Sequence, residues 1–190
     1  MLREITDKNH CIFHSLAVSG ECSSGKSTLC RILSQRLNWK HVDVGNEFRK
    51  ISELRGLKIE KFGSIPDPLL LEIDDRIQHD IKTEVNVVWD GRLTCYLARH
   101  IPKIFKVYCV AELDVRAERS ASRNKISFEE ARRNVLVRDT EEAGVFKRLY
   151  GISNPYNPEW VSLWLDTSAK SPEELADIVL LSLSAGAQAS

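Results

Sequence analysis

The segment of residues 20–27 constrains this chain more than any other. It reads GECSSGKS and matches the pattern G-x-x-x-x-G-K-[ST], in which the backbone curls so that successive N–H groups and a helix N-terminus face phosphate oxygens. A loop of this kind needs a strand before it and a helix after it. Strand-type apolar residues precede it at Ile12, Phe13, Leu16, Ala17 and Val18, and apolar residues at helical spacing follow it at Leu29, Ile32, Leu33 and Leu37. The segment therefore predicts a nucleotide-binding unit in which Lys26 supplies a mobile positive charge and Ser27 holds Mg²⁺.

Strand-like and helix-like stretches alternate along the rest of the chain, with no repeat or linker between them. Further strands are expected at about 41–44, 86–89, 104–110 and 161–165, and helices at about 46–55, 67–82, 127–150 and 171–183. This alternation is typical of a parallel sheet covered by helices, and 190 residues suffice for one compact domain. We therefore expect an α/β fold with a five-stranded parallel sheet flanked by helices.

Several residues are placed to begin or end these helices. Gly56 is placed to end the helix before it, and Asp67 and Pro68 are expected to be the N-cap and the first residue of the next one. Capping boxes begin the later helices at Ser127 and Ser171, because a Glu follows each serine after three positions. Gly151 is expected to end the long helix, and residues 185–190 are expected to be disordered.

Charge and hydropathy narrow the classes of partner. The totals of Lys+Arg and of Asp+Glu are both 27, so no overall basic field favours nucleic acid. No apolar stretch approaches the roughly 20 residues that a membrane helix needs, and the first residues are too polar to begin a secretory signal. We therefore expect a cytoplasmic protein, a monomer or weak dimer, that acts on small molecules and binds neither nucleic acid nor membranes.

The cysteines and histidines indicate neither a disulfide framework nor a zinc site. The five cysteines are an odd number without a C-x-x-C pair, and the five histidines are scattered without the spacing of metal ligands. We interpret Cys30, Cys95 and Cys109 as small buried side chains. Cys22 differs because it lies inside the phosphate loop, at a position compatible with exposure.

Charged residues follow the expected strands at the edge where parallel sheets bind ligands. Arg49 lies about one helical turn beyond the second strand, and Asp90 and Arg92 follow the third. An acid next to a phosphate loop is suited to fix a Mg²⁺-bound water, and a guanidinium can bind a second phosphate bidentately. The alternatives are a turn or N-cap role for Asp90 and surface salt bridges for both arginines.

A dense arginine zone lies after the fourth strand. Phosphoryl transfer spreads negative charge over the moving group, so arginines that close over it are the expected catalysts. Arg119 and Arg123 are four residues apart and share a helix face. The alternative is a solvated helix in which Glu side chains neutralise the arginines. The zone consists of Arg116, Arg119, Arg123, Arg132, Arg133, Arg138 and Arg148.

Taken together, an ordered series of short motifs resembles the short cytidylate kinases of archaeal type. The resemblance extends from about residue 12 to residue 180. Its motifs are Ser19 through Thr28, Val44-Gly45-Asn46-Glu47-Phe48-Arg49, Asp67-Pro68, Glu72-Ile73-Asp74, Gly91-Arg92-Leu93, Arg116-Ala117-Glu118-Arg119, Arg138-Asp139 and Tyr150-Gly151-Ile152.

This resemblance implies a P-loop fold of the nucleoside monophosphate kinase kind. One domain, 1–190, would have a core at 11–45, 84–118 and 158–184, a monophosphate-binding insert at about 46–83 and a lid at about 119–150. The implied reaction is transfer of a phosphoryl group from ATP, with Mg²⁺, to CMP or dCMP.

The resemblance also implies a role for individual residues. ATP would lie against Gly20, Ser23, Ser24, Gly25, Lys26, Ser27 and Thr28. The acceptor would lie against Gly45, Phe48, Arg49, Asp74 and Arg92. Ser27 and Asp90 would hold the metal, and Lys26, Arg119, Arg123 and Arg138 would act on the transferring group.

The chain departs from the family in the segment after Arg138. A basic residue is usual there, and this chain has Gly144-Val145-Phe146 instead. Asn46 and Asp90 also differ from the usual residues, which are Glu at both positions. Either Arg148, from the next helical turn, replaces the absent lid arginine, or the chain is a slow kinase or one with a different acceptor.

Other functions are compatible with parts of this pattern. A related kinase could use another nucleotide, shikimate or a sugar acid as acceptor, and loss of the lid arginine could leave a weakened, nucleotide-binding regulator. A GTP-dependent switch is disfavoured. Asn124-Lys125 follows a helix instead of a strand, and no D-x-x-G follows the third strand.

Overall fold

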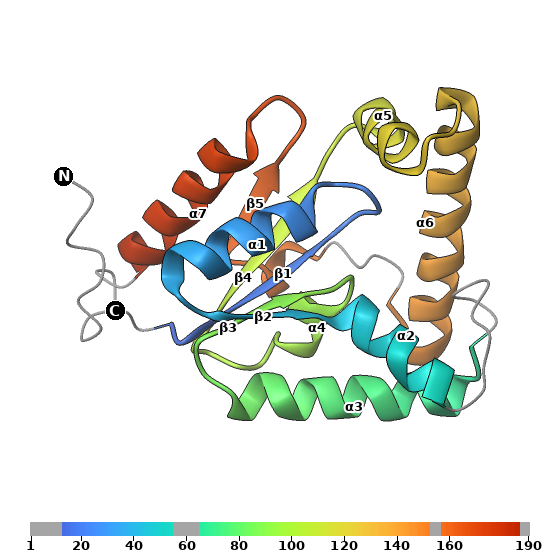
Figure 1. Ribbon diagram of the computed structural model, residues 1–190. Helices are drawn as coiled ribbons and strands as arrows, with labels where there is room; N and C mark the ends of the chain where they lie inside the picture. Colours follow the sequence, from blue (N-terminus) through green and yellow to red (C-terminus); the bar gives the residue numbers. More distant parts are fainter. Residues whose placement is uncertain (1–12, 55–64, 153–156, 187–190) are drawn as a thin grey trace.

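The computed structural model describes residues 13–54, 65–152 and 157–186 and contains the expected parallel sheet. The strands lie in the order β2-β3-β1-β4-β5, and every neighbouring pair is parallel (Figure 1). They are β1 (Ser15–Gly20), β2 (Lys40–Asp43), β3 (Val87–Asp90), β4 (Ile104–Val110) and β5 (Leu163–Asp166). The α/β prediction with five parallel strands is thereby confirmed.

Helices cover both faces of this sheet. They are α1 (Lys26–Leu37), α2 (Val44–Leu54), α3 (Asp67–Thr83), α4 (Thr94–Leu97), α5 (Leu113–Asn124), α6 (Phe128–Tyr150) and α7 (Pro172–Gly186), with a 3₁₀ turn at Pro158–Trp160. α1 and α7 pack on one face, around Leu33 and Val179, and α3 and α4 cover the other face, around Ile73 and Trp89 (Figure 1). The inner strands β1, β3 and β4 are thus buried on both sides, which explains their mostly apolar sequences, whereas the edge strands β2 and β5 are partly exposed.

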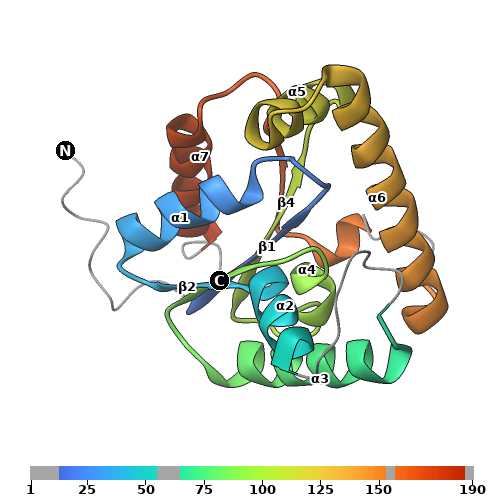
Figure 2. The ribbon, with the colours of Figure 1, turned by 45° about the vertical axis from the view of Figure 1, so that its right-hand side comes forward.

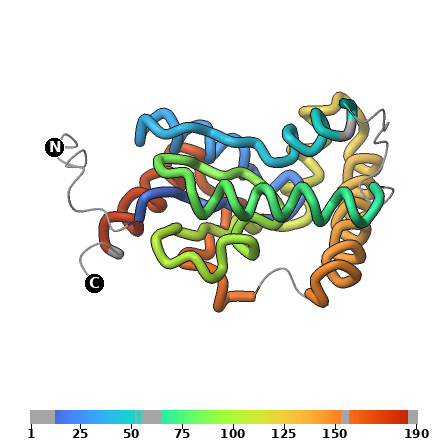
Figure 3. The backbone as a smooth tube through the Cα atoms, turned by 90° about the horizontal axis from the view of Figure 1, so that it is seen from below, coloured from blue at the N-terminus to red at the C-terminus, as the bar shows by residue number. Residues whose placement is uncertain are grey.

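The long helix α6 lies beside the carboxyl edge of the sheet and packs against α5 (Figure 2). Its ends are those expected from the sequence. The Ser127 hydroxyl accepts a hydrogen bond from the Glu130 N–H, and Gly151 adopts a left-handed conformation after the last turn. Seen from below, α3 runs across the molecule towards the end of α6 (Figure 3). The described residues of the segments predicted to be the insert and the lid are therefore mainly helical.

Two helix starts differ from the sequence prediction. Pro66, not Asp67, is the N-cap of α3; Asp67 is its first residue, and its carboxylate pairs with Arg148 instead of capping the helix. Helix α2 begins at Val44, two residues earlier than expected, because the Asp43 carboxylate accepts a hydrogen bond from the Asn46 N–H at 2.9 Å. Asp43 thus caps α2 from the position before the helix, whereas the Asp67 carboxylate is held by Arg148 of another helix.

Some sequence predictions fall outside the described residues. They concern Cys11, Ile12, Gly56 and most of the segment 185–190. The bounds given for the insert and the lid stay predictions. Within the described ranges, no helix combines the length and apolarity that a bilayer crossing requires.

Gly20 shows how closely the backbone approaches itself at the end of β1. Its φ is +147°, and a Cβ added there would lie 2.1 Å from the carbonyl oxygen of Cys109 on β4. We expect Gly20→Ala to lower the free energy of unfolding by roughly 3 kcal/mol or more. Gly144→Ala is the control, because a Cβ at this exposed helical position meets nothing within 4 Å. It should stabilise the fold by about 0.5 to 1 kcal/mol. Equal urea midpoints for the two variants would contradict this account.

Candidate active site

The phosphate loop connects β1 to α1 at the carboxyl edge of the sheet. Ser23 and Gly25 adopt positive φ values of 60° and 88°, which produces the curl expected from the sequence. Lys26 is the first residue of α1, and its Nζ donates a hydrogen bond to the Glu21 carbonyl at 2.8 Å. Burial and then the nearby Arg92 lower the pKa of Lys26 below its ordinary value. An anion in this loop would therefore stabilise the charged form of the lysine.

A cavity of about 610 Å³ opens over the loop. It brings together most of the residues assigned from the sequence: Ser23, Ser24, Gly25, Lys26, Ser27, Thr28, Gly45, Arg49, Asp90, Arg92, Arg119, Arg123 and Arg138. Gly20 is not among the residues that line the cavity. The cavity also has lining residues for which sequence analysis assigned no site role: Cys22, Leu29, Asp43, Gly91, Thr167, Lys170, Pro172 and Leu175. Cys22 is buried, so its backbone position in the loop does not leave the thiol exposed.

Two carboxylates on α6 hold the arginines around this cavity. Arg92 pairs through Nη2 with Asp139 at 3.1 Å and also contacts Glu142. Arg138 donates from Nε to Glu142 at 2.9 Å. Although burial lowers the pKa of Arg92, Glu142 and Asp139 together raise it above its ordinary value. Sequence analysis assigned no site role to Asp139 or Glu142. The four-residue spacing from Arg138 to Glu142 on one helix was the available signal for the second.

Arg116 connects the phosphate loop to a carboxylate on α6. Its side chain is buried, pairs with Asp139 at 2.5 Å and with Glu21 at 3.4 Å, and donates to the Cys22 carbonyl at 3.3 Å. Because Glu21 and Cys22 belong to the loop, this arginine fixes the loop to α6. It is a structural member of the arginine zone.

Two further arginines, both on α5, bind the end of the sheet and the phosphate loop. Arg119 donates to the Thr167 hydroxyl at 3.0 Å and to its carbonyl at 2.5 Å, and Arg123 donates to the Ser23 hydroxyl at 3.2 Å. Thr167 in turn donates to the Ser24 carbonyl at 2.7 Å. Thr167 follows β5 directly, so its place at a strand end was the signal that could have identified it.

The acceptor residues predicted from the resemblance separate into two groups. Gly45 and Arg49 line the cavity beside Asp43, whose carboxylate lies 4.0 Å from the Arg49 guanidinium. Phe48 and Asp74 are not on its wall. Phe48 packs in the apolar cluster beneath α2, and the Asp74 carboxylate accepts a 2.5 Å hydrogen bond from the Tyr150 hydroxyl.

Asp90 and Ser27 supply oxygen atoms of the kind that Mg²⁺ binds. Asp90 is 3 % exposed at the end of β3, and its Oδ2 accepts no hydrogen bond from the residues described. The Ser27 side chain lines the same cavity. A buried carboxylate that lines the same cavity as a hydroxyl and a phosphate loop fits a magnesium–nucleotide complex, although His41 Nε2 also lies 3.4 Å from its Oδ2.

Arg148 does not take the place of the absent lid arginine in this structure. It forms a bidentate pair with Asp67 on the surface between α6 and α3, at 2.7 and 2.9 Å, and is not among the residues that line the cavity. Val145, where the family usually has a basic segment, is buried with Phe146 in the apolar cluster. An arginine at position 145 would therefore point into the core of this fold.

Comparison with known proteins is consistent with this geometry. A model of the cytidylate kinase-like family matches residues 15–169, which is most of the chain. The chain belongs to the cytidylate kinase-like family. Relatives named cytidylate kinase from Methanopyrus kandleri and Pyrococcus abyssi are 36 % and 37 % identical to this family member. Each alignment covers 86 % of this chain and 90 % of the relative.

Solved structures share the fold of this family member at low sequence identity. A gluconokinase from Sinorhizobium meliloti aligns with a TM-score of 0.61 at 17 % identity, over 93 % of this chain and 94 % of that one. A shikimate kinase from Acinetobacter baumannii aligns with a TM-score of 0.60 at 15 % identity, over 92 % and 94 %. These similarities establish a P-loop kinase fold and say nothing about the acceptor.

The buried Asp74 makes a contribution to stability that depends on pH. Burial raises the pKa of its carboxyl to about 6, against an ordinary value of 3.8. The folded state therefore holds a proton that the unfolded state releases, and the contribution of this group to stability falls as the pH rises from about 4 to 6. Asp74→Asn should remove this fall and raise the free energy of unfolding near pH 7.5 by on the order of 2 kcal/mol. The exposed neighbour Asp75 provides the control Asp75→Asn, which should keep the fall. Parallel urea-unfolding profiles for wild type and Asp74→Asn would contradict the assignment.

Proposed function

We propose that this chain transfers the terminal phosphoryl group of ATP to CMP or dCMP. Relatives named cytidylate kinase support the acceptor, and the cavity supports the chemistry. One observation is decisive for the proposal: donor-side Lys26, acceptor-side Arg49 and Arg92, and lid residues Arg119, Arg123 and Arg138 all line one cavity. Nucleotide substrates are thus the small-molecule partners that we propose, and ATP is the donor.

The donor phosphates bind to the loop. The N–H groups from Ser23 to Thr28 and the Lys26 ammonium surround the terminal phosphates in this proposal, as the positive end of α1 also favours an anion. Ser27 and Asp90 hold magnesium. When bound with ATP, magnesium would supply positive charge that offsets the negative charge developing during transfer.

The acceptor phosphate binds to Arg92 and Arg49. Asp139 and Glu142 hold Nη2 of Arg92, while Nη1 is buried and has no hydrogen-bond partner within the described parts of the chain. One side of the guanidinium is thus fixed and the other side is available to an oxygen of CMP. No displacement of the carboxylates is needed. Phe48 and Asp74 do not line the cavity. In this proposal they remain acceptor residues that would support the acceptor site indirectly.

Arg119, Arg123 and Arg138 stabilise the group in transfer. Each already has a partner of its own, namely Thr167, Ser23 and Glu142, so each side chain is oriented before substrates arrive. Preorientation lowers the cost of placing positive charge where negative charge develops. The reaction needs no covalent intermediate on the protein.

Release of ADP against a panel of acceptors tests the proposed activity. CMP and dCMP should give the highest kcat/KM, ahead of other nucleoside monophosphates, shikimate and gluconate. Lys26→Ala should lower turnover with CMP by roughly two to four powers of ten, because the loop loses its cation. A preference for shikimate or gluconate, or unchanged turnover of Lys26→Ala, would overturn the proposal.

Arg49 should act on the acceptor and not on the donor, because it lies beyond β2 on the side of the cavity away from α7. Arg49→Ala is expected to raise the KM for CMP at least roughly tenfold and to change the KM for ATP by less than about twofold. Lys50→Ala is the matched control, because Lys50 pairs with Glu47 on the surface. Equal increases in both KM values would remove Arg49 from the acceptor site.

Arg148 is expected to contribute little to turnover, in contrast to Arg138. Its guanidinium is held by Asp67 outside the cavity. Arg148→Ala should therefore change kcat by less than about twofold, whereas Arg138→Ala should lower it by roughly tenfold or more. Steady-state kinetics with CMP and ATP compare the two. A tenfold loss in Arg148→Ala would mean that the surface pair opens and Arg148 enters the site during turnover.

A further inference from the structure

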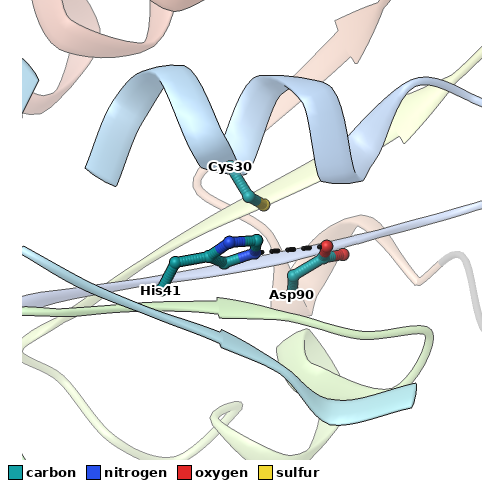
Figure 4. A group of neighbouring side chains, drawn as sticks. All are labelled: Cys30, His41 and Asp90. Carbon is teal, nitrogen blue, oxygen red and sulfur yellow. Dashed lines mark ion pairs between the residues drawn. The ribbon is translucent and has the colours of Figure 1, made fainter. Parts of the chain in front are cut away.

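Three side chains of different chemistry converge beside the nucleotide cavity (Figure 4). Cys30 comes from α1, His41 from β2 and Asp90 from the end of β3. The Cys30 sulfur, an imidazole nitrogen of His41 and a carboxylate oxygen of Asp90 all lie within 4.8 Å of one another. The closest measured pair is His41 Nε2 and Asp90 Oδ2, at 3.4 Å.

Burial leaves this group without other partners. Cys30 is fully buried and Asp90 is 3 % exposed. Neither His41 Nε2 nor Asp90 Oδ2 has a hydrogen-bond partner among the residues that the structure describes. Buried polar atoms are normally hydrogen-bonded, so two such atoms that face each other at 3.4 Å without forming a hydrogen bond, next to a thiol, call for an explanation.

We propose that Cys30, His41 and Asp90 form a zinc site. Sulfur, imidazole nitrogen and carboxylate oxygen are the ligand types that zinc binds, and three protein ligands are typical of a site that keeps one position for water. A thiolate ligand distinguishes this site from a magnesium site, which prefers oxygen atoms alone. The ion replaces the Cys30 thiol proton, which passes to solvent, and no electron is transferred.

The dimensions fit a tetrahedral ion. Zinc–ligand bonds of about 2.0 to 2.3 Å place neighbouring ligand atoms roughly 3.3 to 3.7 Å apart. The His41–Asp90 separation of 3.4 Å already satisfies this range. The upper limit of 4.8 Å for the other pairs exceeds this range by about 1 Å, so binding of the ion would draw these ligand atoms together by at most about this amount.

The absence of a C-x-x-C pair and the scattered histidines predicted that the chain has no zinc site. That rule applies to ligands that lie close together in the sequence. Here each ligand comes from a different element, and only the packing of α1 over the parallel strands β2 and β3 brings them together.

Zinc at this site would compete with magnesium for Asp90. The same carboxylate lines the nucleotide cavity, and an oxygen cannot serve both ions fully. Zinc binds such mixed donor sets more tightly than magnesium does. Low concentrations of zinc should therefore inhibit phosphoryl transfer in the presence of magnesium. This consequence rests on the proposed function, whereas the binding of zinc does not.

Titration of the metal-free full-length chain tests the binding. Calorimetry with Zn²⁺ should show one equivalent bound. Co²⁺ as a spectroscopic probe should give thiolate-to-metal charge-transfer absorption together with the visible bands of a tetrahedral ion. Zn²⁺ should also raise the melting temperature. Absence of the charge-transfer band and of a bound equivalent in the wild type would overturn the proposal.

Single substitutions assign the ligands. Cys30→Ala should abolish the charge-transfer band, and His41→Gln should weaken Zn²⁺ binding at least roughly tenfold. Cys109→Ala is the matched control, since Cys109 is equally buried, and His79→Gln is the control for the exposed histidine on α3. Cys22→Ser tests the other cysteine near the cavity. A band that persists in Cys30→Ala, or that disappears in Cys22→Ser or Cys109→Ala, would refute the site.

The folding of each variant is checked by thermal unfolding without metal. If Cys30→Ala fails to fold, Cys30→Ser provides the same information, because a hydroxyl gives no charge-transfer band with Co²⁺. Inhibition is measured separately, as the ratio of ADP release with and without Zn²⁺ at fixed Mg²⁺. This ratio should fall in wild type and stay near one in Cys30→Ser. A chain that binds Zn²⁺ but has no kinase activity would refute the proposed function and leave the zinc site intact.

Discussion

The site depends on a balance between arginines and a few buried carboxylates at one edge of the sheet. Without anions, the positive charges of Arg92, Arg116 and Arg138 would repel one another in a region of low dielectric constant. Asp139 and Glu142 on α6 neutralise them and hold them in place. Because α6 supplies both carboxylates, this one helix orients the arginines of the site. Substrate phosphates then meet guanidinium groups that are already oriented.

The elements and the centre of the site were predictable from the sequence, because their signals are local. The phosphate loop, the strand ends and the capping box at Ser127 depend on residues that are neighbours in the chain. Contacts between distant segments were not predictable. Asp67 was expected to cap α3, but Arg148, which is far away in sequence, holds its carboxylate. Thr167 and Glu142 had local signals, namely a strand end and a four-residue spacing, but their contacts with Arg119 and Arg92 follow from packing between elements.

Position 145, where the family pattern has a basic segment, lies in the apolar core of this structure. The absence of a basic residue there suggested a weakened catalyst or a replacement by Arg148. In the structure Val145 lies with Phe146 in the apolar core, on the side of α6 that faces α3 and not the cavity. Arg138 and Glu142, on the face that lines the site, are both present. Position 145 therefore contributes to the packing of α6, and Arg138 and Glu142 supply the charges on the other face of the helix.

Asp90 connects the two metal proposals, and its surroundings decide which ion it favours. A buried carboxylate beside a hydroxyl and phosphate oxygens suits magnesium, whereas the same carboxylate beside a thiol and an imidazole suits zinc. Parallel pairing places His41 one strand away from Asp90, and Cys30 lies one helical turn beyond Lys26 on α1. The geometry that brings the acid to the nucleotide thus also brings it to softer ligands. The nearby phosphate loop suits this carboxylate to bind magnesium together with the nucleotide. In our proposal Cys30 and His41 allow the same carboxylate to bind zinc instead.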